Sequence, residues 1–422
     1  MEFPGENLQT CQLRILESSA VNLGASRPLF DGYTPKLKSL IMESLLFIPS
    51  NHFPSLTHLI LDGAMTTTPQ GPYTFINFLL FLSRCPNLEV LHLCALDVAR
   101  LQNLPDGLVI APLQLQQLRK FSNEEVLLDR TGGHHLPYSG PHFRRALLAH
   151  LQFSTNCLIR LATILPHEVG STLHSIPFDE PFTSVYLGAH DYLSFYAGEP
   201  NRLESECFSI MATDPRRQRG MRIDFQMPGT RYAPRNVTTQ SARACLRDGV
   251  RSAPLLARVH ELWVTPSATV LLGEPCSLLG CLPHLTTLVL GLFPLAPDTE
   301  EDIRCHWEPL RALEVRDDFV IPCPRLHTLC VYVTTEEHVI QLYDVLLSRG
   351  EAGYSVRRLV VGFYRPPPAT VLEVAEGLWG LVEDFTLLKY TEWCPDDLLW
   401  VHRLPFVCRD SSERNTYWPA WM

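Results

Sequence analysis

The sequence lacks any apolar run long enough to cross a membrane. The longest run, near residues 75–82, contains Asn77 and ends before Arg84, whereas a membrane-spanning helix needs about 20 apolar residues in succession. The first seven residues, Met-Glu-Phe-Pro-Gly-Glu-Asn, lack the apolar segment of a secretion signal. We therefore expect a protein of the cytoplasm or nucleus that makes no contact with membranes.

Sequence signatures of common catalytic sites are also absent. The chain has no G-x-G-x-x-G or G-x-x-x-x-G-K-[ST] phosphate loop, no G-x-S-x-G nucleophile motif and no H-E-x-x-H zinc motif. The pair His134-His135 has no third ligand at a suitable spacing, and we interpret Cys305-His306 as part of the core. We predict no catalytic residue, no cofactor and no metal site. A cysteine and a histidine that meet only after folding leave an enzyme of unrecognised type as an alternative.

Lysine is scarce, and negative charge prevails. Four of the 35 basic residues are lysines, and the net charge is −10 with histidine neutral. Arginine accumulates in residues 211–260, which hold ten arginines against three aspartates. Outside this window the charge argues against nucleic acid as a partner. Within it, arginine suits bidentate contacts to carboxylates or phosphates, although a general coding preference for arginine explains the window as well.

The thirteen cysteines contain no C-x-x-C pair and are spread along the chain. An odd number without metal-ligand spacing favours reduced thiols over disulfides or zinc. Cys94 and Cys330 stand beside leucines, at positions suited to a small buried hydrophobe. We therefore expect packed, reduced thiols.

A recurring proline–leucine pattern is the most informative feature of the sequence. Five segments place a proline two residues before Leu-x-x-Leu-x-(Leu, Met or Val), and chance would supply well under about one such match. These segments are internal repeats, and they begin at Pro35, Pro54, Pro86, Pro283 and Pro324.

Each repeat ends in an alternating stretch, which predicts a short strand with the leucines on one face. Proline donates no hydrogen bond and fixes its φ angle, so it suits the start of a strand. A helix is expected before some strands, as in residues 73–85 ahead of Pro86. One helix and one strand cannot bury their apolar faces alone, whereas stacked repeats bury a continuous core. The sequence therefore predicts an α/β solenoid with a curved parallel sheet on its inner face.

Weaker copies extend the pattern along the chain. Starts of neighbouring copies lie from 19 residues (Leu37 to Leu56) to 32 residues (Leu56 to Leu88) apart, around the period of about 20–29 residues typical of leucine-rich repeats. The asparagine or cysteine that usually follows the strand is missing, so an asparagine ladder does not join these repeats. Strands are expected at Leu13-x-x-Leu16, Leu118-x-x-Phe121, Phe182-x-x-Val185-x-Leu187, Val259-x-x-Leu262-x-Val264, Leu310-x-x-Leu313-x-Val315, Val356-x-x-Leu359-x-Val361 and Val382-x-x-Phe385-x-Leu387.

The segments Cys85–Leu93, Cys281–Leu290 and Cys323–Leu329 resemble the degenerate leucine-rich repeats of F-box proteins, particularly the large fungal sets of F-box-like proteins. The resemblance covers residues 8–150 and 255–390 and fits residues 150–255 poorly. It implies that the repeats bind a target protein, while an N-terminal F-box would bind the adaptor of a cullin ubiquitin ligase. We find no F-box in this sequence, so adaptor binding would require one upstream.

The spacing of the repeats suggests three parts. Residues 1–130 are expected to hold N-terminal leucine-rich repeats, and residues 131–255 diverged repeats with loops and the arginine-rich segment. Residues 256–422 are expected to hold C-terminal repeats and a capping tail rich in aromatic residues. Within the middle part we expect helices near residues 143–151 and 238–251 and a strand at Met221–Phe225.

The residues between the leucines would form a broad face of the sheet, and we predict a binding surface there. Tryptophan, tyrosine and arginine on such a face are the residue types that anchor protein interfaces. We expect a monomeric protein-interaction module, by resemblance the substrate-recognition part of an F-box-type ubiquitin ligase. A leucine-rich-repeat scaffold unrelated to ubiquitination is the alternative. The candidate partner-binding residues are His58, Asp62, His92, Glu261, Trp263, Glu314, Arg316 and Tyr332.

Overall fold

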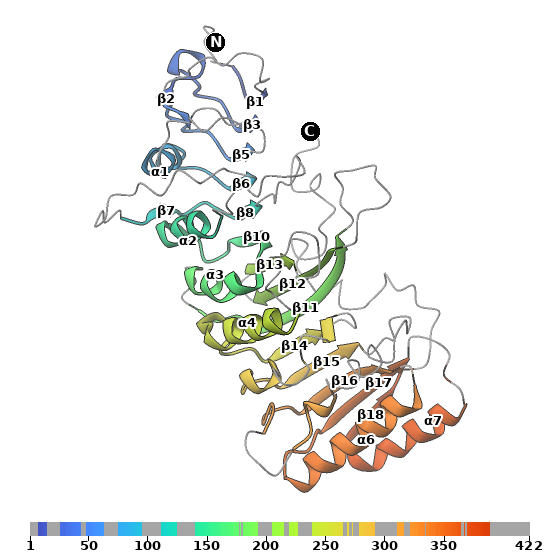
Figure 1. Ribbon diagram of the computed structural model, residues 1–422. Helices are drawn as coiled ribbons and strands as arrows, with labels where there is room; N and C mark the ends of the chain where they lie inside the picture. The colour runs from blue at the N-terminus through green and yellow to red at the C-terminus, as the bar shows by residue number, and fades with distance from the viewer. Residues whose placement is uncertain are drawn as a thin grey trace. The chain divides into compact units, whose positions relative to one another are not determined.

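The structure of the chain is a computed structural model, drawn in Figure 1. It divides into two compact units, of which unit 1 comprises Met1–Ile164 with Ser175–Phe178 and unit 2 comprises Leu165–His174 with Asp179–Met422. The residues that the structure describes are 7–14, 26–43, 48–62, 75–94, 111–124, 140–176, 178, 180–192, 205–214, 219–226, 239–264, 268–269, 272, 278–291, 310–315, 321–333, 335–363, 367 and 369–388.

Unit 1 contains a parallel sheet with the strand order β1-β3-β5-β6-β8-β10. Two further parallel pairs, β2 with β4 and β7 with β9, lie apart from this sheet. In Figure 1 the helices α1 and α2 stand beside the strands of the sheet. The elements of unit 1 are β1 (Thr10–Arg14), β2 (Ser26–Arg27), η1 (Phe30–Gly32), β3 (Ser39–Glu43), β4 (Ile48–Pro49), β5 (His58–Asp62), α1 (Phe75–Ser83), β6 (Val90–Cys94), β7 (Leu113–Leu115), β8 (Lys120–Glu124), α2 (Gly140–His150), β9 (Leu151–Phe153) and β10 (Leu158–Ile164).

Unit 2 contains a mostly parallel sheet with the strand order β13-β12-β11-β14-β15-β16-β17-β18. Its helices α6 and α7 contact each other. The elements around and within it are η3 (Pro166–Glu168), α3 (Val169–Ser175), β11 (Ser184–Tyr192), β12 (Ser205–Asp214), β13 (Arg219–Gln226), α4 (Thr239–Ser252), η4 (Pro254–Leu256), β14 (Glu261–Val264), η6 (Leu278–Cys281), β15 (Thr287–Gly291), β16 (Thr328–Val333), α6 (Glu336–Glu351), β17 (Arg358–Phe363), α7 (Ala369–Glu376), η7 (Gly377–Leu381) and β18 (Asp384–Leu387).

The predicted α/β class is confirmed, and the repeat leucines form the core face of each sheet. In unit 2, the leucine at the second position of each of the strands β14 to β17 pairs with the corresponding leucine of the next strand, and all of them are 0% exposed. Burying a leucine side chain fully stabilises the fold by about 1.5–3 kcal/mol. The alternation thus directs one continuous row into the core: Leu262, Leu288, Leu329 and Leu359.

The fixed position of the proline is explained by a turn. In all five strong repeats, the amide of the first leucine donates a hydrogen bond to the carbonyl of the residue before the proline, as from Leu88 to Cys85 (3.2 Å) and from Leu326 to Cys323 (2.9 Å). Proline therefore occupies the second position of a hydrogen-bonded turn, where its fixed φ is suited and its missing amide is not required. The turn ends the preceding segment and starts the strand.

Each repeat is joined to the next by a shared backbone carbonyl. The carbonyl of Lys38 accepts hydrogen bonds from the amides of Thr57 and His58, both at 2.9 Å, and the carbonyl of Thr57 accepts in the same way from Glu89 and Val90. Unit 2 repeats the arrangement at the carbonyls of Thr183, His260, Thr286, His327 and Arg357. This backbone ladder holds neighbouring repeats in register without an asparagine ladder.

Two regions differ from the predicted parallel strands. β12 runs antiparallel to both β11 and β13, whereas the sequence predicted a parallel sheet. Antiparallel neighbours can be joined without a helical crossover. The expected strand at Met221–Phe225 is confirmed, because it lies inside β13. The expected strand at Leu310–Val315 is wrong, because these residues form a short helical turn closed by the bond from the Leu313 amide to the Leu310 carbonyl.

The expected packing of the cysteines is visible in both units. No two described cysteines form a disulfide, and the buried thiols include those of Cys85, Cys157 and Cys323. Burial raises the pKa of Cys85 and of Cys323 to about 12, although Arg84 and Arg349 respectively oppose that shift. These thiols are therefore protonated core groups. Within the described residues, no helix combines the length and apolar character that a membrane crossing requires.

A first prediction concerns the side chains that join consecutive turns. Asn87, the residue after a turn proline, donates from Nδ2 to the Pro54 carbonyl of the preceding repeat (2.7 Å). Replacing Asn87 by alanine should lower the free energy of unfolding by about 0.5–1.5 kcal/mol, since one inter-repeat hydrogen bond is lost. Chemical denaturation measures the change. Arg325→Ala, an exposed residue at the same turn position, is the control, and an equal loss in both variants would contradict this role.

A second prediction concerns Arg349 of α6, which is 0% exposed. Its guanidinium donates to the carbonyls of Leu313 (3.2 Å), Pro322 (2.9 Å) and Cys323 (3.0 Å). Lysine keeps the charge but cannot reach three carbonyls. The Cys323 carbonyl keeps its bond from the Leu326 amide, whereas each buried carbonyl left unsatisfied costs about 1–3 kcal/mol. Arg349→Lys should therefore lower the free energy of unfolding by about 2–4 kcal/mol.

The matched control for Arg349→Lys is Arg358→Lys. Arg358 lies at the surface and pairs with Asp384 (Nε to Oδ2, 3.3 Å), and an exposed pair contributes less than about 1 kcal/mol. If the two variants unfold at the same denaturant concentration, the three carbonyl bonds of Arg349 do not stabilise the fold.

Candidate functional site

The face of each sheet opposite the repeat leucines carries the candidate functional residues. In unit 2, one row of this face runs across adjacent strands in register, and we call it the aromatic row. Its tyrosine and one valine are buried, and its other members are half-buried. The aromatic row consists of Tyr186, Trp263, Val289, Cys330 and Val360.

Glycines make room for the tyrosine rings on this face. Tyr332 is paired with Gly362 of β17, and a Cβ atom on Gly362 would lie 2.7 Å from the Tyr332 ring. Likewise, a Cβ on Gly188 would lie 2.6 Å from the Tyr186 ring. Because the rings occupy the space of the missing side chains, they lie down on the sheet, a known way to cover glycine in a strand.

Burial affects the ionisation of both tyrosines. Burial raises the pKa of Tyr186 to about 12, while Arg222 acts in the opposite direction. Burial also raises the pKa of Tyr332, and Cys330 raises it further. Both tyrosines are therefore neutral at physiological pH and present an apolar ring with a polar tip, the chemistry of an interface anchor rather than of a general base.

Polar residues border the aromatic row on the N-terminal side of the strands. Ser184 donates to a carboxylate oxygen of Glu261 (Oγ to Oε2, 3.2 Å), and Arg358 pairs with Asp384. These residues share one register row with Thr287 and Thr328. An apolar row with a polar border is the composition that protein interfaces commonly have.

Two arginines of the arginine-rich segment are structural. Arg222 is 1% exposed and binds Asp224 (Nε to Oδ1, 2.7 Å), which also accepts a hydrogen bond from Ser209. Arg219 donates to the carbonyls of Glu180 and Pro181 and lies over the Phe182 ring. Since both guanidinium groups are committed within the fold, they are not available to an external phosphate.

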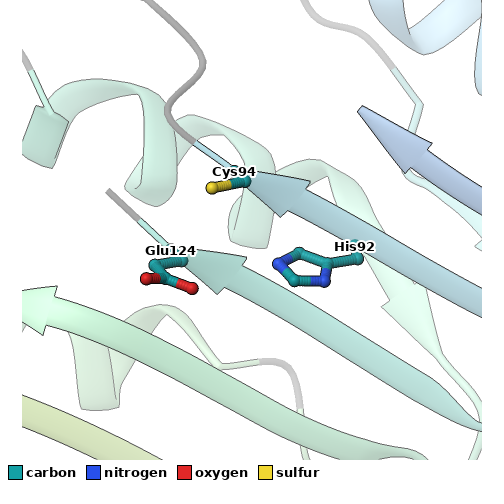
Figure 2. A group of neighbouring side chains, drawn as sticks. All are labelled: His92, Cys94 and Glu124. Atoms are coloured by element: carbon teal, nitrogen blue, oxygen red, sulfur yellow. The ribbon is translucent and has the colours of Figure 1, made fainter. Parts of the chain in front are cut away.

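In unit 1, the corresponding face brings a histidine, a cysteine and a glutamate together. His92 and Cys94 are two residues apart on β6, so they lie on the same face. Cys94 is directly paired with Glu124, the last residue of β8. Figure 2 shows the three side chains on one side of these neighbouring strands. One ligand atom from each lies within 4.8 Å of the others, a set suited to a metal ion.

The other two candidates of unit 1 lie on the same face. His58 contacts Thr57 (Nδ1 to Oγ1, 2.8 Å). Burial lowers the pKa of His58, while Glu89 opposes this shift and Lys120 adds to it. Asp62 is paired with Glu43 on one side and Cys94 on the other. His58 is thus neutral at physiological pH, and Asp62 borders the His92–Cys94–Glu124 group.

The remaining sequence-predicted residues do not join these faces. Glu314 lies in the bend after the helical turn at Leu310, where its amide bonds to the Arg311 carbonyl (3.1 Å). The prediction that Glu314 occupies the strand face is therefore wrong. Arg316 lies outside the described residues, as do the His134-His135 pair and the aromatic tail.

Two residues of these faces were missed from the sequence. Tyr186 stands between Val185 and Leu187 of a weak repeat, so the alternation that selected Trp263 applies to it as well. Glu124 stands three residues beyond Phe121, on the opposite face. Its proximity to Cys94 depends on strand register, which the sequence does not state.

The fold and the two strand faces define the chain as an α/β protein built from consecutive turn-and-strand units. No protein-family model matches it, and neither a curated protein nor a solved structure matches it. The arguments about function therefore rest on the strand faces themselves.

The contact between Tyr332 and Gly362 yields a third prediction. Gly362→Ala should destabilise the fold by about 1–3 kcal/mol, because the new methyl group overlaps a ring that is packed on the sheet. In a Tyr332→Ala background the same substitution should have little effect, since the overlap is gone. A double-mutant cycle by chemical denaturation measures this coupling. Gly377→Ala, with open space around the added Cβ, is the control, and additive effects at 332 and 362 would refute the contact.

Proposed function

We propose that this chain is a protein-interaction module, built as a degenerate leucine-rich-repeat solenoid with a curved sheet on its inner face. The repeated turn, the shared carbonyl and the row of buried leucines support stacked repeats of one kind. Stacked repeats of this kind present a broad strand surface. In the leucine-rich-repeat proteins that the sequence resembles, that surface binds the partner.

The aromatic row of unit 2 carries this proposal. Trp263 of this row and Tyr332, which lies two residues beyond Cys330 on the same face of β16, are half-buried. Each therefore keeps part of its ring accessible while its position is fixed by the sheet. Rigid aromatic anchors surrounded by polar groups lose little conformational entropy on binding and dominate many interfaces. A folded protein or peptide segment is the partner that such a surface fits.

The resemblance to F-box-like proteins suggests the setting of a ubiquitin-ligase substrate receptor. In that setting the strand face binds a target and a separate F-box binds the cullin adaptor, so the chain itself needs no catalytic residue. We place the protein in the cytoplasm or nucleus as a monomer. A scaffold unrelated to ubiquitination rests on the same strand face and differs only in lacking the adaptor.

Affinity purification of the tagged chain from its own cells, with mass spectrometry, separates these settings. Recovery of the cullin adaptor together with other proteins supports the substrate receptor. Recovery of reproducible partners without the adaptor supports the scaffold. A chain that retains no partner, while an enzymatic activity copurifies with it, would overturn the interaction module.

The fourth prediction tests Trp263 of the aromatic row and the neighbouring Tyr332 with the strongest captured partner. Trp263→Ala and Tyr332→Ala should each weaken binding by at least tenfold, or about 1.4 kcal/mol, while the cooperative thermal unfolding is retained. Trp379→Ala is the control, because Trp379 is 70% exposed and belongs to η7 rather than to a strand. Equal affinities of all three variants, measured by calorimetry, would show that neither Trp263 nor Tyr332 contributes to the interface.

A further inference from the structure

We propose that His92, Cys94 and Glu124 form a zinc-binding site in unit 1. The proposal is independent of the interaction function, since it rests on a different unit and on different residues. Cys94 and Glu124 are the last residues of two adjacent parallel strands, and His92 lies two residues before Cys94. The carboxyl ends of parallel strands are where open α/β sheets commonly gather their ligand-binding groups.

The positions of the ligands follow from strand geometry. His92 and Cys94 are separated by one residue, so their Cα atoms are about 6.6–6.8 Å apart along β6 and their side chains share one face. Glu124 is opposite Cys94 on β8, about 4.8 Å away across the sheet. The ligand atoms themselves lie within 4.8 Å of one another.

A zinc ion would need only a small further approach of these atoms. Zinc bonds of about 2.0–2.3 Å in a tetrahedral arrangement place ligand atoms about 3.3–3.8 Å apart. The observed separations are within roughly 1.5 Å of that range, a distance that side-chain rotation covers without moving the strands. In the part of the chain that the structure describes, no other group of three such side chains converges this closely.

The chemistry of the ligands selects the metal. A thiolate, an imidazole and a carboxylate together match the ligands of zinc, which binds sulfur, nitrogen and oxygen alike. Magnesium and calcium require oxygen ligands, which only Glu124 provides. Three protein ligands leave the fourth tetrahedral position for a water molecule.

Burial supplies the second, independent argument. Cys94 is 6% exposed and Glu124 is 8% exposed, and buried carboxylates are stabilised by hydrogen bonds, by a cationic side chain or by a metal ion. A divalent zinc ion neutralises one carboxylate and one thiolate together. Arg160 is the competing cation, because it is paired with Ser122 on the same face of the neighbouring strand. Metal binding and pairing with Arg160 make different predictions for zinc content.

The full chain, purified without a metal-affinity tag and equilibrated with zinc chloride, provides the test. Elemental analysis after gel filtration should find one zinc ion per chain. Replacement by cobalt should produce a thiolate-to-cobalt charge-transfer band in the near ultraviolet and visible ligand-field bands of a tetrahedral site. Loss of a residue that hydrogen-bonds to a metal ligand weakens metal binding by about 10–100-fold. Removing a ligand itself should weaken zinc binding by more than this.

Two ligand variants and one control separate this site from the other cysteines. Cys94→Ser and Glu124→Gln should both lose the zinc and the cobalt spectrum, whereas Cys330→Ser, on the strand face of unit 2, should keep both within twofold. Glu124→Gln is close in shape to the native residue, and circular dichroism checks that each variant is folded. If Cys94→Ser does not fold, the cobalt spectrum of the native chain and Glu124→Gln decide the outcome.

The proposal is overturned by any of three results. The first is that the native chain binds no stoichiometric zinc at micromolar concentration. The second is that its cobalt complex lacks the thiolate band. The third is that Glu124→Gln retains zinc at the native affinity, which would mean that Glu124 interacts with protein neighbours such as Arg160 and not with the metal.

Discussion

The structure depends above all on one backbone carbonyl in each repeat that accepts two successive amides from the next repeat. The Lys38 carbonyl holds Thr57 and His58, and the Thr57 carbonyl holds Glu89 and Val90. Because side chains alternate along a strand, a slip of one residue would turn every repeat leucine toward solvent. The doubled hydrogen bond fixes the register at the start of each strand, and the proline turn delivers the chain to that point. The row of buried leucines and the residue rows on the opposite face both follow from this register.

The same arrangement leaves carbonyl groups in the turns that no strand satisfies. Arginine fills this need repeatedly: Arg349 binds three carbonyls in unit 2, and Arg84 binds the Ser50 carbonyl in unit 1. Arg144 of α2 joins the Asn123 side chain to the Ala162 carbonyl. A buried guanidinium is expensive to desolvate, and burial indeed lowers the pKa of Arg349. It is retained because its fork satisfies several acceptors at once.

The sequence predicted most strands and one face of each, since proline turns and alternation are local properties. It failed where the answer depends on distant partners. Leu310–Leu313 has the same spacing as the strand repeats, yet it forms a helical turn whose Leu313 carbonyl binds Arg349, 36 residues away. The antiparallel direction of β12 is likewise a tertiary property. Trp263 and His92 were found by alternation, whereas Glu124 belongs with Cys94 only through the register of two strands 30 residues apart.

Residues between the leucines point away from the leucine core. The two units can therefore hold different side chains at these positions while they keep the same arrangement of strands. In unit 2 the intervening positions hold aromatic rings, and glycines at 188 and 362 yield their space to them. In unit 1 they hold a thiol, an imidazole and a carboxylate, of which two are nearly inaccessible to water. The leucine core would be equally satisfied by threonine or valine at these places. The register that pairs Cys94 with Glu124 also brings His92 close, so that one ligand atom from each lies within 4.8 Å of the others. Strand geometry alone therefore assembles three groups of metal-ligand type on the face opposite the leucines.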